Sequence, residues 1–329
     1  MFASMTQINR YALVKIILAF AAIYIIWGTT YIAIRIAVET MPAFLMAGIR
    51  FLTAGTITFA VLRAREVPLP TRGQWRSAVI IAAFLLVGGN GLVTWAEKQV
   101  SSSIAALVVA TMPLWMTLFE WLLFRGTKPG RQTAAGLLLG FVGIGLLVGP
   151  GQIRGTADFD LLSLLLLMAA PILWSLGSLY SRRVRLPENV FMTTAMEMLA
   201  GGGLLLLAGL ITGEAGQLQV AAITSQSLWA LLYLILFGSI VAYTAYVWLL
   251  KTVQPARVAT YTYINPIVAV ALGWLILSEP ITPLMLAAMG IIVLAVILIT
   301  TQRPKKSVTV QPVATLTTSL VANPSTSMD

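Results

Sequence analysis

Ten apolar runs of about 20 residues each constrain the fold of this chain more than any other feature. They cover residues 14–35, 43–62, 77–96, 102–123, 132–150, 160–180, 190–212, 227–250, 257–277 and 282–300. A hydrocarbon core about 30 Å thick needs roughly 20 apolar residues per helix. Because backbone polar groups must be satisfied within each segment in lipid, such runs favour helices. The sequence therefore predicts an all-α integral membrane protein with ten transmembrane helices, joined by short polar connections.

Composition excludes a soluble domain and several kinds of chemistry. Hydrophobic residues make up 59% of the chain and charged residues 10%, and the mean hydropathy is +0.92. Soluble domains are about 45–50% apolar and about 25% charged. The chain has no cysteine and no histidine, which excludes a disulfide framework, thiol chemistry and the commonest metal ligand. We therefore predict no metal site and no cofactor.

The positive charges lie almost entirely in alternate loops. Of the 21 Lys and Arg residues, 17 fall on one side of the predicted spans and 3 on the other, and Arg50 lies within a span. The positive-inside rule then places both termini in the cytoplasm. This distribution also accounts for the net charge of +10 without a nucleic-acid partner, and we predict the lipid bilayer as the surroundings instead.

The two halves of the chain repeat one another. At a shift of 153 residues six identities share one register, including Trp95 with Trp248 and Pro113 with Pro266. At a shift of 147 residues the earlier helices align, including Trp27 with Trp174 and Gly55 with Gly202. We divide the chain into a first repeat (1–150), a second repeat (151–303) and a cytoplasmic tail (304–329) whose composition predicts disorder.

Five spans in each copy make the second copy enter the membrane from the opposite face. The repeat-related Lys98 and Lys251 accordingly fall on opposite sides of the predicted membrane. Two similar bundles related by an axis in the membrane plane can open a midplane site alternately to either side. The inverted repeat therefore predicts a transporter with a small-molecule substrate.

Five stretches of the chain resemble the EamA-type permeases of the drug/metabolite transporter superfamily. They are YIIWGTTYIAIR (24–35), GNGLVTWAEKQ (89–99), IAALVVATMPLW (104–115), GLLLGFVGIGLLV (136–148) and ATYTYINPIVAVALGWLILSE (259–279). The resemblance implies ten helices in two EamA repeats and a multi-pass protein of the bacterial inner membrane. It also implies export of small metabolites, such as amino acids or related amphipathic compounds.

Two ionisable residues lie deep within predicted spans. Arg50 and Glu197 are 147 residues apart, the register of the repeat, so they occupy equivalent positions with opposite charge. Charged groups at membrane depth cost several kcal/mol and call for a reason. Either they neutralise each other and hold the halves together, or they act in function. In the second case they gate or bind a zwitterionic substrate, or Glu197 carries a coupling proton.

Aromatic and hydrogen-bonding side chains within the spans form the candidate substrate cavity, because polar groups at this depth need to face protein or water. They are Trp27, Thr30, Tyr31, Asn90, Thr94, Trp174, Tyr243, Tyr263 and Asn265. Pro113 and Pro266 are predicted to kink their helices, since proline removes a backbone donor. Bonding between helices is the alternative role for the polar residues.

Three further features have local interpretations. We interpret Glu97 beside Lys98 as an interfacial pair. Glu279, at the outer end of the ninth span, is interpreted as a helix cap or loop anchor. The Gly136–Gly140 pair, extended by Gly143, suits close helix packing, either within the protein or in a homodimer.

No catalytic motif stands in the sequence. It contains no GxxxxGK[ST] phosphate loop and no GxSxG, and an HExxH motif is impossible without histidine. We therefore predict no catalytic residues and no enzyme activity. The leading function is a secondary transporter working by alternating access, and the alternative is a non-transporting membrane sensor or scaffold that keeps the fold. A substrate-dependent flux separates the two.

Overall fold

A computed structural model describes residues 10–124, 126, 128–154, 161–253 and 258–301. Side chains are described for these residues except 10–12, 147–154, 263 and 300. Over the described part of the chain the structure is helical and contains no strand. The predicted all-α class is therefore confirmed, whereas the predicted tail (304–329) lies outside the described residues.

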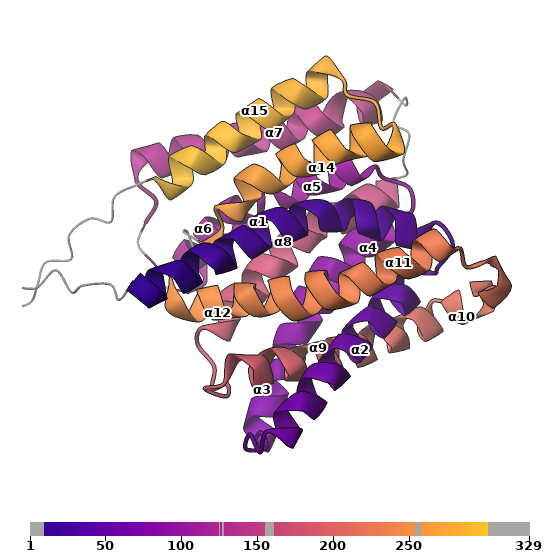
Figure 1. Ribbon diagram of the computed structural model, residues 1–329. Helices are drawn as coiled ribbons and strands as arrows, with labels where there is room; N and C mark the ends of the chain where they lie inside the picture. The colour runs from indigo at the N-terminus through magenta and orange to yellow at the C-terminus, as the bar shows by residue number, and fades with distance from the viewer. Residues whose placement is uncertain (1–9, 125, 127, 155–160, 254–257, 302–329) are drawn as a thin grey trace, which may run out of the picture.

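The helices follow one another with short connections (Figure 1). The first half contains α1 (Arg10–Val38), α2 (Ala43–Ala64), α3 (Arg72–Ala82), η1 (Ala83–Gly91), α4 (Leu92–Ala96), α5 (Ser102–Val109), α6 (Met112–Leu122) and α7 (Arg131–Arg154). The second half contains α8 (Leu161–Ser181), α9 (Val190–Ile211), α10 (Glu214–Gln217), η2 (Val220–Ala222), α11 (Ser225–Tyr233), η3 (Leu234–Tyr243), α12 (Thr244–Thr252), α14 (Tyr261–Leu277) and α15 (Pro283–Thr300).

Helices occupy all the predicted apolar runs. Among the described residues, seven helical stretches are long and apolar enough to cross a membrane. The other three predicted runs hold α7, α14 and α15, whose apolar stretches with described side chains are Arg131–Leu146, Ile264–Leu277 and Pro283–Ile299. The chain thus has the helices of a multi-pass membrane protein, and the count of ten crossings stays a prediction.

Three of the long stretches are interrupted. The π-helices η1 and η3 are continuous with the α-helices on either side of them and lie at repeat-equivalent positions. The run 102–123 is divided between α5 and α6, and Pro113 lies in the first turn of α6, where a missing N–H costs nothing. Pro266 lies inside α14. The two prolines predicted to kink helices therefore occupy different positions in their elements.

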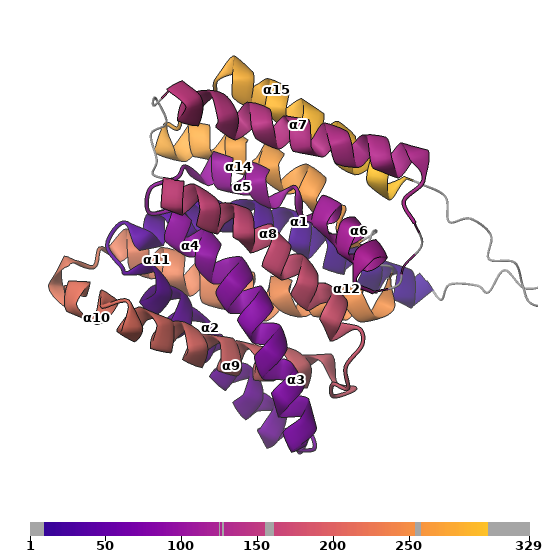
Figure 2. The ribbon, with the colours of Figure 1, turned by 180° about the vertical axis from the view of Figure 1, so that it is seen from behind.

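The packing of the helices has a two-fold pattern (Figures 1 and 2). α7 and α15 lie side by side along one edge of the molecule, and α2, α9 and α3 lie along the opposite edge. α1 packs on α14 and on the stretch α11–η3–α12, while α8 packs on α5, α6 and the stretch α3–η1–α4. Each of these contacts of α1 thus has a counterpart at α8, its equivalent in the other half.

The contact between α2 and α9 repeats this pattern at the level of single residues. A Cβ added to Gly55 would lie 2.8 Å from the backbone nitrogen of Leu199, and one added to Gly202 would lie 2.5 Å from that of Leu52. Both residue pairs, glycine with glycine and leucine with leucine, are 147 positions apart. Reciprocal contacts of this kind are typical of elements related by a two-fold axis.

The glycine face of α7, formed by Gly136, Gly140 and Gly143, packs against other helices of the same chain. A Cβ on Gly136 would lie 2.8 Å from the carbonyl oxygen of Ala295, and one on Gly143 would lie 2.7 Å from Ile292, both on α15. A Cβ on Gly140 would lie 2.1 Å from Leu114 of α6. Of the two roles expected for this face, the structure shows close packing inside the protein.

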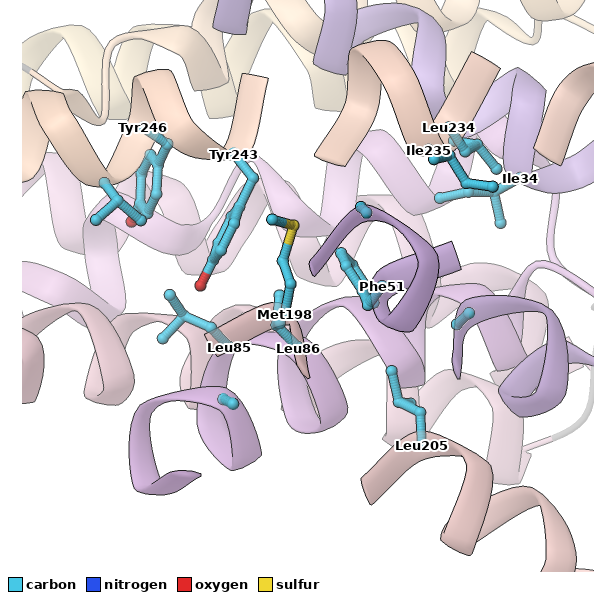
Figure 3. Packing of buried hydrophobic residues seen from close by; sticks show 14 of the residues in the cluster. Ile34, Phe51, Leu85, Leu86, Met198, Leu205, Leu234, Ile235, Tyr243 and Tyr246 are labelled. Atoms are coloured by element: carbon cyan, nitrogen blue, oxygen red, sulfur yellow. The ribbon is translucent and has the colours of Figure 1, made fainter. Parts of the chain in front are cut away.

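The main core lies where helices of the two halves meet. Phe51 of α2 and Met198 of α9 are buried in it beside Tyr243, with Leu85 and Leu86 of η1 below them (Figure 3). Because these side chains come from both halves, the core fixes one half against the other and surrounds the space described next.

Candidate functional site

A cavity lies between the helices of the two halves, and about 60 Å³ of it is open to water. Seven of the nine candidate cavity residues line it, namely Trp27, Thr30, Tyr31, Asn90, Trp174, Tyr243 and Asn265. Thr94 is buried outside the lining and donates to the carbonyl oxygen of Asn90 at 2.8 Å. The side chain of Tyr263 lies outside the described residues. The structure thus brings seven of the nine candidates together around one cavity, and their role in substrate binding stays a prediction.

Aromatic rings form much of the cavity wall. The rings of Trp27 and Trp174, which the repeat relates, meet edge to face with their centroids 5.5 Å apart. Trp27 also lies 5.1 Å from Tyr261 and 5.0 Å from Tyr246, and Trp174 lies 6.5 Å from Tyr243. Rings at these distances pack favourably. They present a wall suited to an apolar or cationic group.

Tyr246 positions this wall, and the sequence interpretation missed it. Its hydroxyl accepts a 2.8 Å hydrogen bond from the indole nitrogen of Trp174 and lies 2.7 Å from the hydroxyl oxygen of Ser178. Tyr246 is fully buried. It stands three residues after Tyr243, one helical turn along the same stretch, and this spacing was the available signal.

The two π-helices bring backbone close to the cavity. Gly89 of η1 and Gly238 of η3 both line it. A Cβ on Gly89 would lie 2.4 Å from the Trp174 ring, so only glycine lets this ring lie against η1. Trp27 donates from its indole nitrogen to the carbonyl oxygen of Gly238 at 3.3 Å. π-Helical segments free backbone groups and are frequent at functional sites.

Arg50 is the basic residue of the lining. It is only 2% exposed, and its Nε donates to the hydroxyl oxygen of Ser239 at 2.8 Å. Its Nη1 lies 3.5 Å from the Oδ1 of Asn90, a long contact, and its guanidinium carbon lies 4.6 Å from the Phe51 ring centroid. None of the hydrogen bonds described for Arg50 involves Glu197, its counterpart in the repeat.

Glu197 lies on the other side of Tyr243. The Tyr243 hydroxyl donates to Glu197 Oε2 at 2.7 Å, and Glu197 is 1% exposed. Tyr243 lines the central cavity, whereas Glu197 lines a second hollow, together with Arg182 and Lys251. A single hydrogen bond therefore connects the two spaces.

Hollows lie on both sides of the central cavity and contain charged residues. One is lined by Arg35, Glu39 and Glu279, which the charge count places toward the outer face. The other is lined by Arg182, Glu188, Glu197 and Lys251, which it places toward the cytoplasm. Arg35 and Arg182 are equivalent in the repeat, so the two hollows are related as the halves are.

The predictions for two acidic residues near span ends have different outcomes. Glu279 accepts hydrogen bonds from the backbone nitrogens of Ser102 at 2.8 Å and Ser103 at 3.1 Å, so the predicted cap is confirmed at the start of α5. The prediction of an interfacial pair for Glu97 is wrong. Glu97 is fully buried, its carboxylate oxygens have no hydrogen-bond partner among the described residues, and Arg35 donates to its backbone carbonyl.

The cavity suits binding of a small molecule. Among the described residues, no group of three or more His, Cys, Asp or Glu side chains could hold a metal ion. The lining combines rings with a few hydrogen-bonding groups, the composition typical of small-molecule sites.

Both halves of the chain match one family model. Residues 14–149 and 161–301 each match the EamA-like transporter family. The chain is also 42% identical, over 284 residues, to a protein of Escherichia coli K12 named "uncharacterized inner membrane transporter YedA", covering 86% of this chain and 89% of that protein.

More distant relatives cover nearly the same length. A Bacillus subtilis protein named "uncharacterized transporter YvbV" is 25% identical over 87% of this chain and 91% of its own length. A solved crystal structure superposes with a TM-score of 0.64 at 22% identity, covering 88% of this chain and 98% of the other. This last likeness concerns the fold alone.

Proposed function

This chain belongs to the EamA-like transporter family, and we propose that it exports small amphipathic metabolites, such as amino acids, by alternating access. It is a multi-pass transporter of the inner membrane. The proposal adds a direction, a class of substrate and a mechanism to that assignment. The observation that carries it is the central cavity lined by rings and hydrogen-bonding groups from both halves.

We propose the architecture as two inverted repeats, 1–150 and 151–303, with ten spans and both termini in the cytoplasm. The two-fold packing supports it, since the contacts of α1 and α8 correspond. The reciprocal contacts of Gly55 and Gly202 support it as well. A site at the interface of two such repeats is reached from opposite sides as one repeat rocks against the other.

The size of the cavity supports a closed conformation in this structure. The roughly 60 Å³ open to water is far below the roughly 300–1,000 Å³ of ligand pockets, so binding of an amino acid requires the walls to move apart. The hollow at Arg35 and Glu279 and the hollow at Arg182 and Lys251 then serve as the two routes of access. If the cavity widens toward one hollow while it stays separated from the other, the site is open to one side of the membrane at a time, which is alternating access.

Counterflow in proteoliposomes tests the substrate class. Purified protein is reconstituted with neutral, aromatic or hydroxy amino acids inside, and then with cationic dyes, and uptake of the labelled compound is followed. We expect accumulation with one of the amino-acid groups. No accumulation with any amino acid, from protein shown to be folded, would contradict the proposed substrate.

A matched pair of tryptophan variants tests the cavity. Trp174→Ala removes a ring from the lining, and we expect counterflow to fall at least about fivefold, the equivalent of about 1 kcal/mol of ring contact. Trp229→Ala is the control, because Trp229 is 70% exposed on α11 and should transport normally. Equal transport by both variants would argue against this cavity as the site.

Coupling is proposed to involve Glu197. Its hydrogen bond to Tyr243 connects the cavity with the cytoplasmic hollow, a suitable place for a proton carrier. We expect Glu197→Gln to keep counterflow, which needs no net coupling, while removing the pH dependence of transport. Full transport with unchanged pH dependence in this variant would exclude proton coupling through Glu197 and leave facilitated diffusion.

A further inference from the structure

We propose that Arg50 binds a carboxylate of the transported molecule, so that the substrates are monoanionic or zwitterionic compounds with an apolar or aromatic body. The inference rests on the proposed function and narrows its substrate class. It begins from Arg50, a residue that lines the central cavity and is only 2% exposed.

The guanidinium has more hydrogen-bond donors than the surrounding protein uses. Arg50 carries five N–H groups, and the described contacts are one good hydrogen bond to Ser239 and one long contact to Asn90. No hydrogen-bonding partner of Nη2 is found in the part of the chain that the structure describes. An unpaired charge in a buried site is costly, and a bound anion would remove that cost.

No described hydrogen bond joins Arg50 to a nearby acidic residue. Glu197 accepts a hydrogen bond from Tyr243, and neither carboxylate oxygen of Glu97 has a hydrogen-bond partner among the described residues. The cavity therefore has one cationic group without a bonded carboxylate partner, which suits a ligand with a single negative charge.

The protein positions the guanidinium from the opposite half. Gly238 of η3 lets it lie close to the backbone, because a Cβ there would be 2.9 Å from Nη2. Ser239, the next residue, fixes Nε. The planar group is thus held by one edge, and a guanidinium can bind a carboxylate through two parallel hydrogen bonds.

The rest of the lining fits the remainder of an amino acid. The rings of Trp27, Trp174 and Tyr261 lie in the same cavity as Arg50. Aromatic faces attract ammonium groups and pack against apolar side chains. A molecule with its carboxylate at Arg50 and its body among these rings would satisfy both parts of the site.

Pairs of ligands that differ only in the carboxylate test the inference. The full chain in proteoliposomes is loaded with L-phenylalanine or phenethylamine, and with L-leucine or 3-methylbutylamine. Charge-assisted hydrogen bonds contribute about 1.5–3 kcal/mol, so we expect each acid to give roughly tenfold or more counterflow than its amine. Thermal stabilisation of the purified protein by the same four compounds gives a second readout.

Asn90→Asp tests the role of Arg50 without removing it. The new carboxylate stands beside Nη1 and should occupy the free donors, so carboxylate counterflow should fall roughly tenfold or more while thermal stability is kept or raised. Gln219→Glu is the control, because it adds the same charge at an exposed residue between α10 and η2, and it should still prefer acids to amines. Arg50→Gln should lose the preference for acids.

The outcomes separate this inference from the proposed function. Phenethylamine moving as well as phenylalanine, or Asn90→Asp moving acids normally, would overturn the role of Arg50. Transport of dyes or amines alone would overturn it too and leave a transporter of amphipathic compounds. If none of these probes moves or stabilises the wild-type protein, both proposals fail.

Discussion

At the scale of the residue, Glu279 joins two elements that are far apart in the sequence. It follows α14, yet its carboxylate accepts hydrogen bonds from the first turn of α5, about 177 positions earlier. The first N–H groups of a helix have no partner within it, and a negative charge there is also favoured by the helix dipole. This cap fixes the start of α5 against the end of α14.

We expect Glu279→Ala to lower the free energy of unfolding by about 1–2 kcal/mol, the usual cost of removing a cap. Thermal unfolding in detergent measures the effect. Glu39→Ala is the control, because Glu39 lines the same hollow but is exposed, and no hydrogen bond from a helix N-terminus is described for its carboxylate. Equal loss of stability in the two variants would show that the charge of the hollow, and not the cap, is responsible.

The residues that the sequence could identify are those that the repeat or polarity makes conspicuous. Trp27 and Trp174 appear as a repeated pair, and Asn90 as an amide in an apolar run, and all three line the cavity. The partners of these residues could not be predicted. Ser239, which fixes Arg50, is 189 positions away from it, and only the packing of η3 against α2 brings them together.

At the scale of the element, two neighbouring glycines of α9 differ in how closely another helix approaches them. Gly202 is buried against α2, where a Cβ would lie 2.5 Å from the backbone nitrogen of Leu52 and 3.0 Å from the carbonyl oxygen of Gly48. Its neighbour Gly203 has nothing within 4 Å of an added Cβ. Backbone atoms cannot move aside as a flexible side chain can, so the two positions should respond differently.

Gly202→Ala is expected to lower the free energy of unfolding by about 1–3 kcal/mol, because overpacking forces the two helices apart. Gly203→Ala should be neutral or stabilising by up to about 1 kcal/mol, since alanine favours the helix more than glycine does. Thermal unfolding of the two purified variants makes the comparison. A similar melting temperature for both would mean that α2 and α9 are not in close contact.

Hydropathy predicts where helices lie but not how they are interrupted. The predicted run 77–96 corresponds to α3, η1 and α4, and the run 227–250 to α11, η3 and α12. A change from α to π hydrogen bonding leaves the order of apolar residues unchanged, so no hydropathy pattern records it. Gly88, Gly89 and Gly238 mark these segments in the sequence, but their close contacts, with Leu173, Trp174 and Arg50 in turn, depend on the packing of other helices.

At the scale of the whole molecule, the two-fold packing explains why chemically different residues occupy equivalent places. Arg50 and Glu197 are related by the repeat, as are Asn90 and Tyr243. Arg50 contacts Asn90 and Glu197 accepts from Tyr243, so the same geometric pair occurs once in each half with different chemistry. The proposed anion site at Arg50 and the proposed coupling site at Glu197 therefore occupy repeat-equivalent positions, one in each half.

The orientation of the molecule can be measured because the chain has no cysteine of its own. Leu69, in the connection between α2 and α3, is 64% exposed, and Val220, between α9 and α11, is 72% exposed. The distribution of Lys and Arg places the first in the cytoplasm and the second outside. In intact cells, a membrane-impermeant maleimide should label Val220→Cys and should label Leu69→Cys only after the cells are opened.

This pair tests the inverted arrangement as well as the orientation. Both sites follow the second span of their own repeat, so two repeats of the same orientation would place both on one side of the membrane. Opposite accessibility requires the second half to enter the membrane from the other face, as expected for five spans in each half. Labelling of both sites in intact cells, or of neither, would contradict the inverted repeat and with it the two-sided access proposed for the cavity.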